Sequence, residues 1–232
     1  RAQLESNRSS IDSYLDRAPT SACCVILDSV HGSTFRAYRT LNKTPSSIYR
    51  SWAYSWMVER EPDFVSRLGM ANTKEKFDEF HCALGDDLRQ YWFQQEGTEF
   101  SWGHSRKLLD LFLKHVLFWD KLDRGSPARN NLRKFAKPAL DKFTLKYISA
   151  VSGIAGLRNK SSWTMGYINN SIERYTAVQN AILAAVEEEP IRFDVLAWNL
   201  EHSKSIGLGS QASKKHDRHN PGSFLIKAKP VN

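Results

Sequence analysis

A lysine and an aspartate, each at the expected start of an apolar helix, are the side chains in this sequence best suited to chemistry. Lys107 lies four residues after Gly103 and begins a run of leucines with helical spacing. Asp141 lies three residues after Pro138 and precedes the next apolar helical pattern. An amine can attack an electrophilic carbon and form a Schiff base, and a carboxylate can stabilise the positive charge that develops there. Cleavage of an N-glycosidic bond uses both groups, because C1′ of the sugar becomes electrophilic as the base departs.

The position of Lys107 favours the neutral form of its amine, which is the nucleophilic form. Lysine is normally charged at neutral pH. In the first turn of a helix, the amine lies near the positive end of the helix dipole, has Arg106 beside it, and is partly desolvated when a substrate covers it. All three effects lower the pKa of Lys107.

Both residues also have ordinary structural interpretations. Lys107, Asp110 and Lys114 share one face of the predicted helix, opposite its apolar residues, as a solvent-exposed charged stripe does. Asp141 is a good N-cap for the helix that follows it, and a capping role is compatible with catalysis. The residue pattern therefore leaves an exposed stripe and a reactive site both open.

Three features of the sequence have the spacing of a known family. Lys107 follows a glycine at the head of an apolar helix, Asp141 follows a proline at the start of the next helix, and residues 190–198 read Pro-Ile-Arg-Phe-Asp-Val-Leu-Ala-Trp. These features resemble the nucleophilic lysine, the catalytic aspartate and the start of the last helix in the helix-hairpin-helix DNA glycosylases, above all their archaeal 8-oxoguanine branch. The resemblance covers residues 97 to about 150 and 190–199.

This resemblance implies an enzyme that flips a nucleotide out of double-stranded DNA and excises a damaged or modified base. It assigns catalysis to Lys107 and Asp141, and Trp102 is a candidate for the base pocket. DNA binding falls to the hairpin residues, which are Gly103, His104, Ser105 and Arg106.

The resemblance leaves the substrate and the second half of the mechanism open. Attack by Lys107 gives a covalent imine and AP-lyase strand cleavage, whereas attack by water leaves an intact abasic site. The substrate is either 8-oxoguanine, which implies DNA repair, or another modified base, such as a modified cytosine of phage DNA, which implies a defence role.

The sequence departs from the family pattern at two points. Ser105 replaces the second glycine of the hairpin, and a left-handed backbone costs more at serine than at glycine. The backbone N–H of Ser105 can still bind a phosphate at a helix N-terminus. The loop expected over residues 123–131 is longer than in most family members.

The charge balance is basic and favours a nucleic-acid partner. The chain has 33 Lys and Arg against 25 Asp and Glu, a formal net charge of +8, and a pI near 9.4. A basic surface attracts phosphates whatever the base sequence.

The main alternative to a glycosylase is a non-catalytic basic helical protein that binds DNA or RNA. A metal-dependent nuclease needs clustered acidic or histidine ligands, and the sequence offers no compact set.

The cysteines exclude the iron–sulfur glycosylase branches, because three cysteines cannot supply four cluster ligands. Cys23, Cys24 and Cys82 also lack the spacing of a zinc site. We expect Cys23 and Cys24 to lie in a buried apolar segment, and we expect no metal and no cofactor.

No apolar run approaches the length of about 20 residues that spans a membrane. We therefore expect a cytoplasmic monomer that binds no membrane.

The apolar periodicity predicts a mainly α fold, a glycosylase-like helical bundle with a cleft between two helical lobes. Residues 1–200 form one globular domain, and residues 201–232 form a basic tail, in which His216, Asp217 and His219 are weak metal-ligand candidates. Helices are expected over 4–17, 73–95 and 161–187, and after a cap at Ser46-Ser47, while 23–30 fits either a strand or a buried helix. Large aromatic residues at helical spacing are expected mainly in the core. They are Trp52, Trp56, Tyr91, Trp92 and Trp163.

Overall fold

The computed structural model describes residues 2–30, 34–35, 38, 44–151, 168, 171–186 and 189–208. Helices make up all the regular structure of this part of the chain, apart from one isolated parallel bridge between Thr20 and Trp119, so the predicted mainly α class is confirmed. No helix among these residues is both long and apolar enough to cross a membrane. The helices are α1 Ala2–Ser6, α2 Arg8–Leu15, α3 Ala22–Ser29, α4 Pro45–Tyr54, a π-helical segment Ser55–Glu59, α5 Glu61–Met70, α6 Lys74–Glu96, α7 Trp102–Val116, α8 Pro127–Phe135, α9 Lys142–Val151, α10 Ile172–Val186 and α11 Ile191–Leu208.

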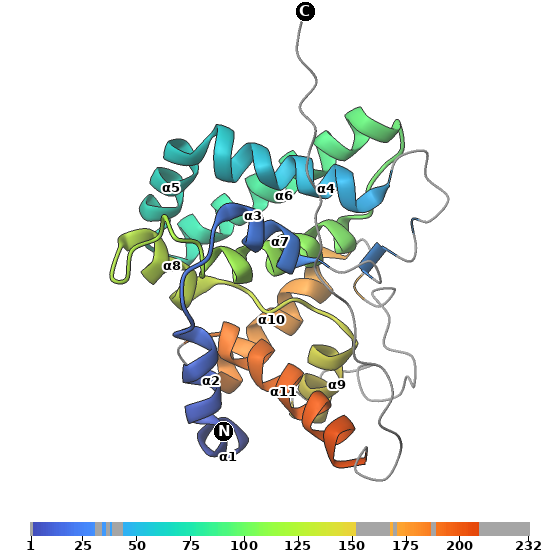
Figure 1. Cartoon of the computed structure of the whole chain (residues 1–232). Helices are drawn as coiled ribbons and strands as arrows, with labels where there is room; N and C mark the ends of the chain where they lie inside the picture. The colour runs from blue at the N-terminus through green and yellow to red at the C-terminus, as the bar shows by residue number, and fades with distance from the viewer. Residues whose placement is uncertain are drawn as a thin grey trace, which may run out of the picture.

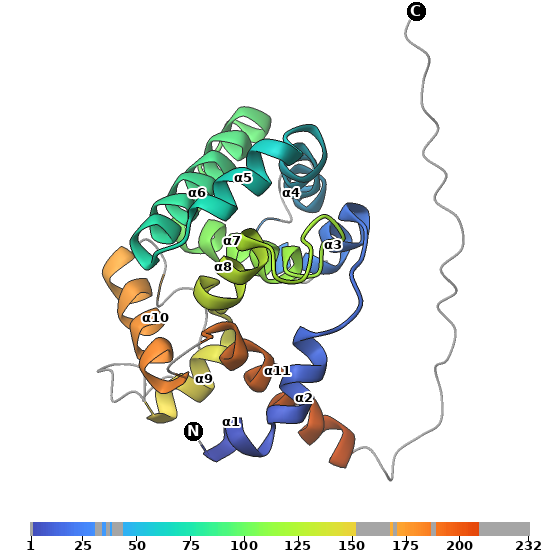
Figure 2. The same cartoon turned by 90° about the vertical axis from the view of Figure 1, so that its left-hand side faces the viewer.

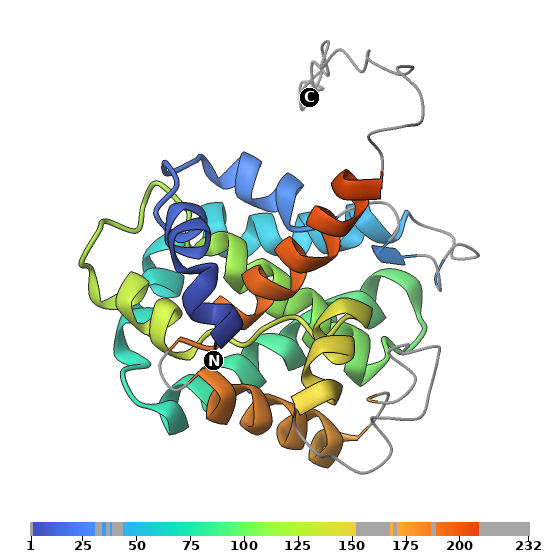
Figure 3. The same ribbon diagram turned by 90° about the horizontal axis from the view of Figure 1, so that it is seen from below.

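Helix α7 lies in the middle of the molecule. Figures 1 and 2 show α4, α5 and α6 on one side of it and α9, α10 and α11 on the other. Apolar residues of α7 such as Leu109, Phe112 and Leu113 are completely buried. Seen from below in Figure 3, the last helix, α11, runs beside α2 at the edge of the same assembly. Side chains of α7 are therefore surrounded by elements from both ends of the chain.

The apolar side chains form two clusters. The larger one unites residues of α2 to α8, and the smaller one unites Leu140 with residues of α9 and α10. Helix α11 contributes to both, with Ile191 and Val195 in the larger cluster and Phe193 in the smaller one. The cleft between two lobes stays a prediction.

Several helix starts follow from local chemistry. The side chains of Ser21, Thr73 and Ser126 each accept a hydrogen bond from the first turn of the helix that follows. Helix α4 begins at Pro45, one residue before the predicted Ser46-Ser47 cap, because a proline in the first turn loses no intrahelical hydrogen bond.

Three expectations about loops and helix lengths are wrong. The predicted loop over 123–131 already contains the start of α8 at Pro127, because Ser126 and Pro127 supply a cap and a first-turn proline. The predicted N-terminal helix is interrupted at Asn7, between α1 and α2. Helix α10 covers only Ile172–Val186 of the helix predicted over 161–187, because residue 168 lies in a turn, while residues 161–167, 169–170 and 187 lie outside the described part.

The apolar run at residues 23–30 is helical, and its cysteines are exposed. In α3 the side chains of Val25, Ile26 and Ser29 are buried, whereas Cys23 and Cys24 face solvent. The expectation of buried cysteines is therefore wrong, because a helix, unlike a strand covered on both faces, exposes one side of a continuous apolar run.

Large aromatic residues are in the core, as expected for Trp52, Trp56 and Trp92, while Tyr91 is partly buried and Trp163 lies outside the described residues. The indole N–H groups of Trp52 and Trp56 both donate to the same oxygen of Asp87, at 2.7 and 2.8 Å. Helix α11 continues into the predicted basic tail as far as Leu208. The rest of that tail, with His216, Asp217 and His219, lies outside the described part.

Candidate active site around Lys107 and Asp141

Lys107 lies in the second turn of α7 and is only partly exposed. Burial lowers the pKa of its amine below the ordinary value of 10.5, and the carboxylates of Asp141 and Asp194 oppose this effect. Lys107 therefore interacts electrostatically with two acids from other elements. The lower pKa favours the neutral, nucleophilic amine.

Asp141 caps α9 and also interacts with Lys107. Its Oδ1 accepts hydrogen bonds from the backbone N–H groups of Phe143 and Thr144, at 2.8 and 2.9 Å. Burial raises the pKa of Asp141 above its ordinary value, and the charge of Asp194 adds to the rise, while the cap hydrogen bonds and Lys107 oppose it. The capping role and the electrostatic interaction with Lys107 thus coexist.

A second charged pair, Lys114 and Asp194, completes this group. Lys114 lies two turns beyond Lys107 on α7, and its ammonium donates to Asp194 Oδ2 of α11, with both side chains buried. Burial acts to lower the pKa of Lys114, but the adjacent Asp194 carboxylate outweighs it, so the pKa is raised. We call Lys107, Lys114, Asp141 and Asp194 the charged cluster.

The charged face of α7 is not a solvent-exposed stripe, so that interpretation is wrong. Asp110 is 0% and Lys114 7% exposed. Sequence reasoning did not single out Lys114 or Asp194 as site residues. Two signals could have found them: Lys114 has the helical spacing of Lys107, and Asp194 is the acid in the segment 190–198 that carries the family resemblance.

The four predicted DNA-binding residues lie inside the first turns of α7, and three of them are buried. The backbone of Gly103 is helical, and the left-handed glycine between α6 and α7 is Gly97, at φ 69°. Ser105 is completely buried and donates from its hydroxyl to the Trp102 carbonyl at 2.7 Å. His104 retains partial exposure, and its ring meets the Tyr38 ring edge-on with centroids 5.2 Å apart.

Arg106 is directed into the protein, where it is 3% exposed. It donates to the carbonyls of His81 and Cys82 at 2.8 and 3.2 Å and to the Asp86 carboxylate at 3.1 Å. A contact between this side chain and a DNA phosphate would require it to leave those partners. The assignment of DNA binding to Gly103, His104, Ser105 and Arg106 stays a prediction.

Trp102 does not share a cavity with the charged cluster. It lines a cavity of about 320 Å³ between α6, α7 and α10, and neither Lys107 nor Asp141 is among the lining residues. The ring of Trp102 meets Tyr175 edge-on at a centroid distance of 5.3 Å, and the Arg106 guanidinium lies 5.1 Å from its centre. Its assignment to a base pocket stays a prediction.

The described residues contain no group of three His, Cys, Asp or Glu side chains placed to hold a metal ion. The chemistry that the charged cluster itself offers is an amine of lowered pKa, in the second turn of α7, that interacts electrostatically with a carboxylate at the start of α9. The case for an active site here rests on this geometry, because no protein-family model, no curated protein and no solved structure matches the chain.

Proposed function

We propose that this protein is a DNA glycosylase that cleaves the N-glycosidic bond of a damaged or modified base. The observation that carries the proposal is the partly buried Lys107, whose amine has a lowered pKa and interacts with the Asp141 carboxylate. An amine that is neutral more often than an ordinary lysine, next to an acid that can stabilise a cationic sugar, is what this reaction needs.

In the proposed reaction, the bond between C1′ and the base breaks, and the bonding electron pair leaves with the base, which takes up a proton. Asp141 stabilises the positive charge at C1′, and the neutral amine of Lys107 attacks that carbon. Loss of a proton from the adduct and opening of the sugar ring then give an imine, from which strand cleavage follows. If water attacks in place of Lys107, the product is an intact abasic site.

Asp194 and Lys114 set the charge around the reacting pair, and Asp194 opposes the protonation states that the reaction needs. Asp194 holds the pKa of Asp141 up and the pKa of Lys107 closer to its ordinary value. Lys114 forms an ion pair with Asp194, so the buried negative charge of Asp194 near Lys107 and Asp141 is compensated. The net charge of +8 supports attraction of the whole protein to DNA.

The test is incubation with duplex oligonucleotides that carry oxidised, alkylated, deaminated or hypermodified bases, in EDTA, followed by alkali to reveal abasic sites. Excision of one base type that is lost in both Lys107→Gln and Asp141→Asn, while DNA binding is retained, is the expected result. The exposed neighbours Lys121 and Asp120 supply matched controls, because Lys121→Gln and Asp120→Asn make the same chemical changes outside the charged cluster.

The same experiment separates the possible substrates and mechanisms. Cleavage at 8-oxoguanine indicates repair, and cleavage at a modified cytosine indicates defence against phage DNA. Borohydride captures the imine as a covalent protein–DNA adduct only if Lys107 is the nucleophile. Full activity in both site variants would refute the assignment, loss of activity in EDTA would indicate a nuclease, and salt-sensitive binding without excision would indicate a non-catalytic binding protein.

A further inference from the structure

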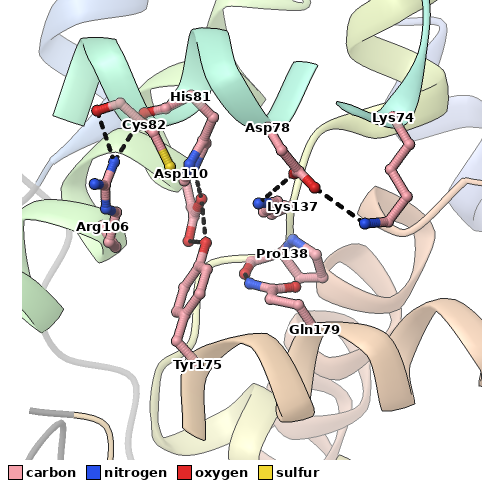
Figure 4. Close-up of polar contacts among 10 residues, drawn as sticks. All are labelled: Lys74, Asp78, His81, Cys82, Arg106, Asp110, Lys137, Pro138, Tyr175 and Gln179. Atoms are coloured by element: carbon pink, nitrogen blue, oxygen red, sulfur yellow. Dashed lines mark hydrogen bonds and ion pairs between the residues drawn. The ribbon is translucent and has the colours of Figure 1, made fainter. Parts of the chain in front are cut away.

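The cavity beside α7 is a second candidate binding site. It has a volume of about 320 Å³, within the usual range for small-molecule sites. Figure 4 draws some of its lining side chains, from α6, α7 and α10, together with Lys137. The charged cluster faces elsewhere, because Lys107 follows Arg106 by about 100° around the helix, and only Arg106 of the two lines the cavity.

A buried hydrogen-bond network fixes one wall of this cavity. His81 Nε2 lies 2.7 Å from Asp110 Oδ1, and the Tyr175 hydroxyl donates to the same carboxylate at 2.9 to 3.0 Å. Burial, with the charges of Lys137 and Arg106, lowers the pKa of His81 well below 6.5, so the imidazole is neutral. The rings of His81 and Tyr175 stack with centroids 6.3 Å apart. These contacts join three helices and hold flat aromatic surfaces in place.

Two polar atoms of the lining lack a hydrogen-bond partner among the described residues. Arg106 Nε is buried and unpaired, although the other nitrogens of its guanidinium donate to α6. Gln179 donates from Nε2 to the Pro138 carbonyl at 3.0 Å, but its Oε1 is buried and unpaired. Both side chains are more than nine-tenths buried. Unpaired buried groups are costly, so one donor and one acceptor here are available to a ligand.

The charge of the lining favours an anion. Four of the described lining side chains are basic, namely Lys74, Arg106, Lys134 and Lys137, and one, Asp78, is acidic. Asp78 already pairs with Lys137 at 2.6 Å and with Lys74 at 3.0 Å. Figure 4 shows Arg106 and these lysines on either side of Tyr175, so the aromatic wall has basic groups at both ends.

We propose that this cavity binds a nucleotide, with its planar base at the Trp102 and Arg106 end and its phosphate at the end formed by Lys74, Lys134 and Lys137. Arg106 Nε donates to the base, and Gln179 Oε1 accepts from a hydroxyl or N–H of the ligand. Aromatic side chains that stack on a base are a common feature of nucleotide sites. The same chemistry fits a free mononucleotide and one nucleotide of a DNA strand, and the experiment distinguishes these sources.

Cys82 provides a reporter for occupancy, because it is exposed and also lines the cavity. Alkylation of Cys82 in the full chain, followed by peptide mass spectrometry, should slow down when a nucleoside monophosphate is added. Cys23 and Cys24 are exposed on α3 and serve as internal controls whose rates should not change. The probes are the four deoxynucleoside monophosphates, the matching nucleosides, inorganic phosphate and a short single-stranded oligonucleotide.

Two variants test the phosphate end of the site and its unpaired acceptor. Lys134→Gln, at an exposed lysine, should weaken protection by the monophosphate roughly five- to tenfold and leave protection by the nucleoside unchanged. Gln179→Met should weaken protection by both. Lys76→Gln, at an exposed lysine of the same protein that does not line the cavity, is the matched control.

Protection by the oligonucleotide but not by free monophosphates would support the site with a DNA strand as its source. Equal protection by inorganic phosphate, or protection that survives in Lys134→Gln and Gln179→Met, would overturn the proposal, as would no protection by any probe. The outcome is independent of base excision, because Lys107→Gln should keep nucleotide protection. A failure here is therefore distinguishable from a failure of the proposed glycosylase activity.

Discussion

Gly85 allows Arg106 to lie across α6, and replacing it tests the placement of that arginine. A Cβ at position 85 would lie 2.0 Å from Arg106 Nη1 and 2.7 Å from Cζ. Gly85→Ala must therefore move a guanidinium that is 3% exposed and donates to the carbonyls of His81 and Cys82. We expect the substitution to destabilise the protein, although alanine is the better helix former.

The magnitude follows from two opposing effects. Alanine in a helix interior gains about 1 kcal/mol over glycine. Hydrogen bonds from a charged donor contribute about 1.5 to 3 kcal/mol each, and two of them are lost. At about 1.5 kcal/mol for each hydrogen bond, less the gain of about 1 kcal/mol from alanine, the free energy of unfolding falls by about 2 kcal/mol. The lower value for each bond applies because the displaced guanidinium regains hydrogen bonds to water. For a chain of this size, that loss corresponds to a fall in Tm of about 4 to 8 °C.

Urea denaturation followed by circular dichroism, together with thermal unfolding, measures the effect. Gly69→Ala on α5 is the matched control, because a Cβ there would meet its nearest neighbours, Ala128 N and Pro127 Cβ, at 3.9 Å. It should be neutral or stabilising by up to about 1 kcal/mol. Gly85→Ala should also become harmless in an Arg106→Ala background. Equal stabilisation by Gly85→Ala and Gly69→Ala would refute the position of Arg106.

Three further predictions concern the charged cluster and a helix cap. Lys114→Met leaves the buried Asp194 charge alone and should lower the free energy of unfolding by about 3 to 5 kcal/mol in urea denaturation. Adding Asp194→Leu should recover most of that loss, and a larger loss in the double variant would contradict the pairing. The rate of base excision should rise between about pH 6 and pH 10, because the pKa of Lys107 is lowered from 10.5 and its neutral amine increases as the pH approaches that pKa. A rate measured in single-turnover kinetics that is flat or falls over this interval is incompatible with that role. Ser126→Ala removes the side-chain acceptor at the start of α8 and should cost about 1 kcal/mol, while unchanged stability would mean that the cap contributes nothing.

The sequence was sufficient for the elements that local chemistry controls. The start of α6 after Thr73 and the cap that Asp141 forms on α9 both follow from a polar side chain immediately before an apolar helical pattern. The mainly α class followed from the same periodicity. It also placed Lys107 in the N-terminal half of α7 and Asp141 at the start of α9, although α8 lies between these helices and only the structure shows that the two residues interact.

The surroundings of α7 could not be predicted, because they come from distant segments. Asp110 receives its hydrogen bond from Tyr175, 65 residues later, and Lys114 pairs with Asp194, 80 residues later. Helical periodicity identifies the polar face of α7 but says nothing about what covers it. Arg106 was assigned to DNA for the same reason, since the gap above Gly85 that accepts its side chain is visible only in three dimensions.

The burial of charged residues along α7 has a consequence for the order in which the chain can fold. During synthesis α7 emerges before α10 and α11, which carry the partners of Asp110 and Lys114. Without α10 and α11, Lys114 lacks the carboxylate of Asp194, and Asp110 keeps its contact with His81 but lacks the hydroxyl of Tyr175, so burial of these groups is costly. We infer that the native arrangement of the early helices forms together with α10 and α11, so that the described helices acquire their structure cooperatively.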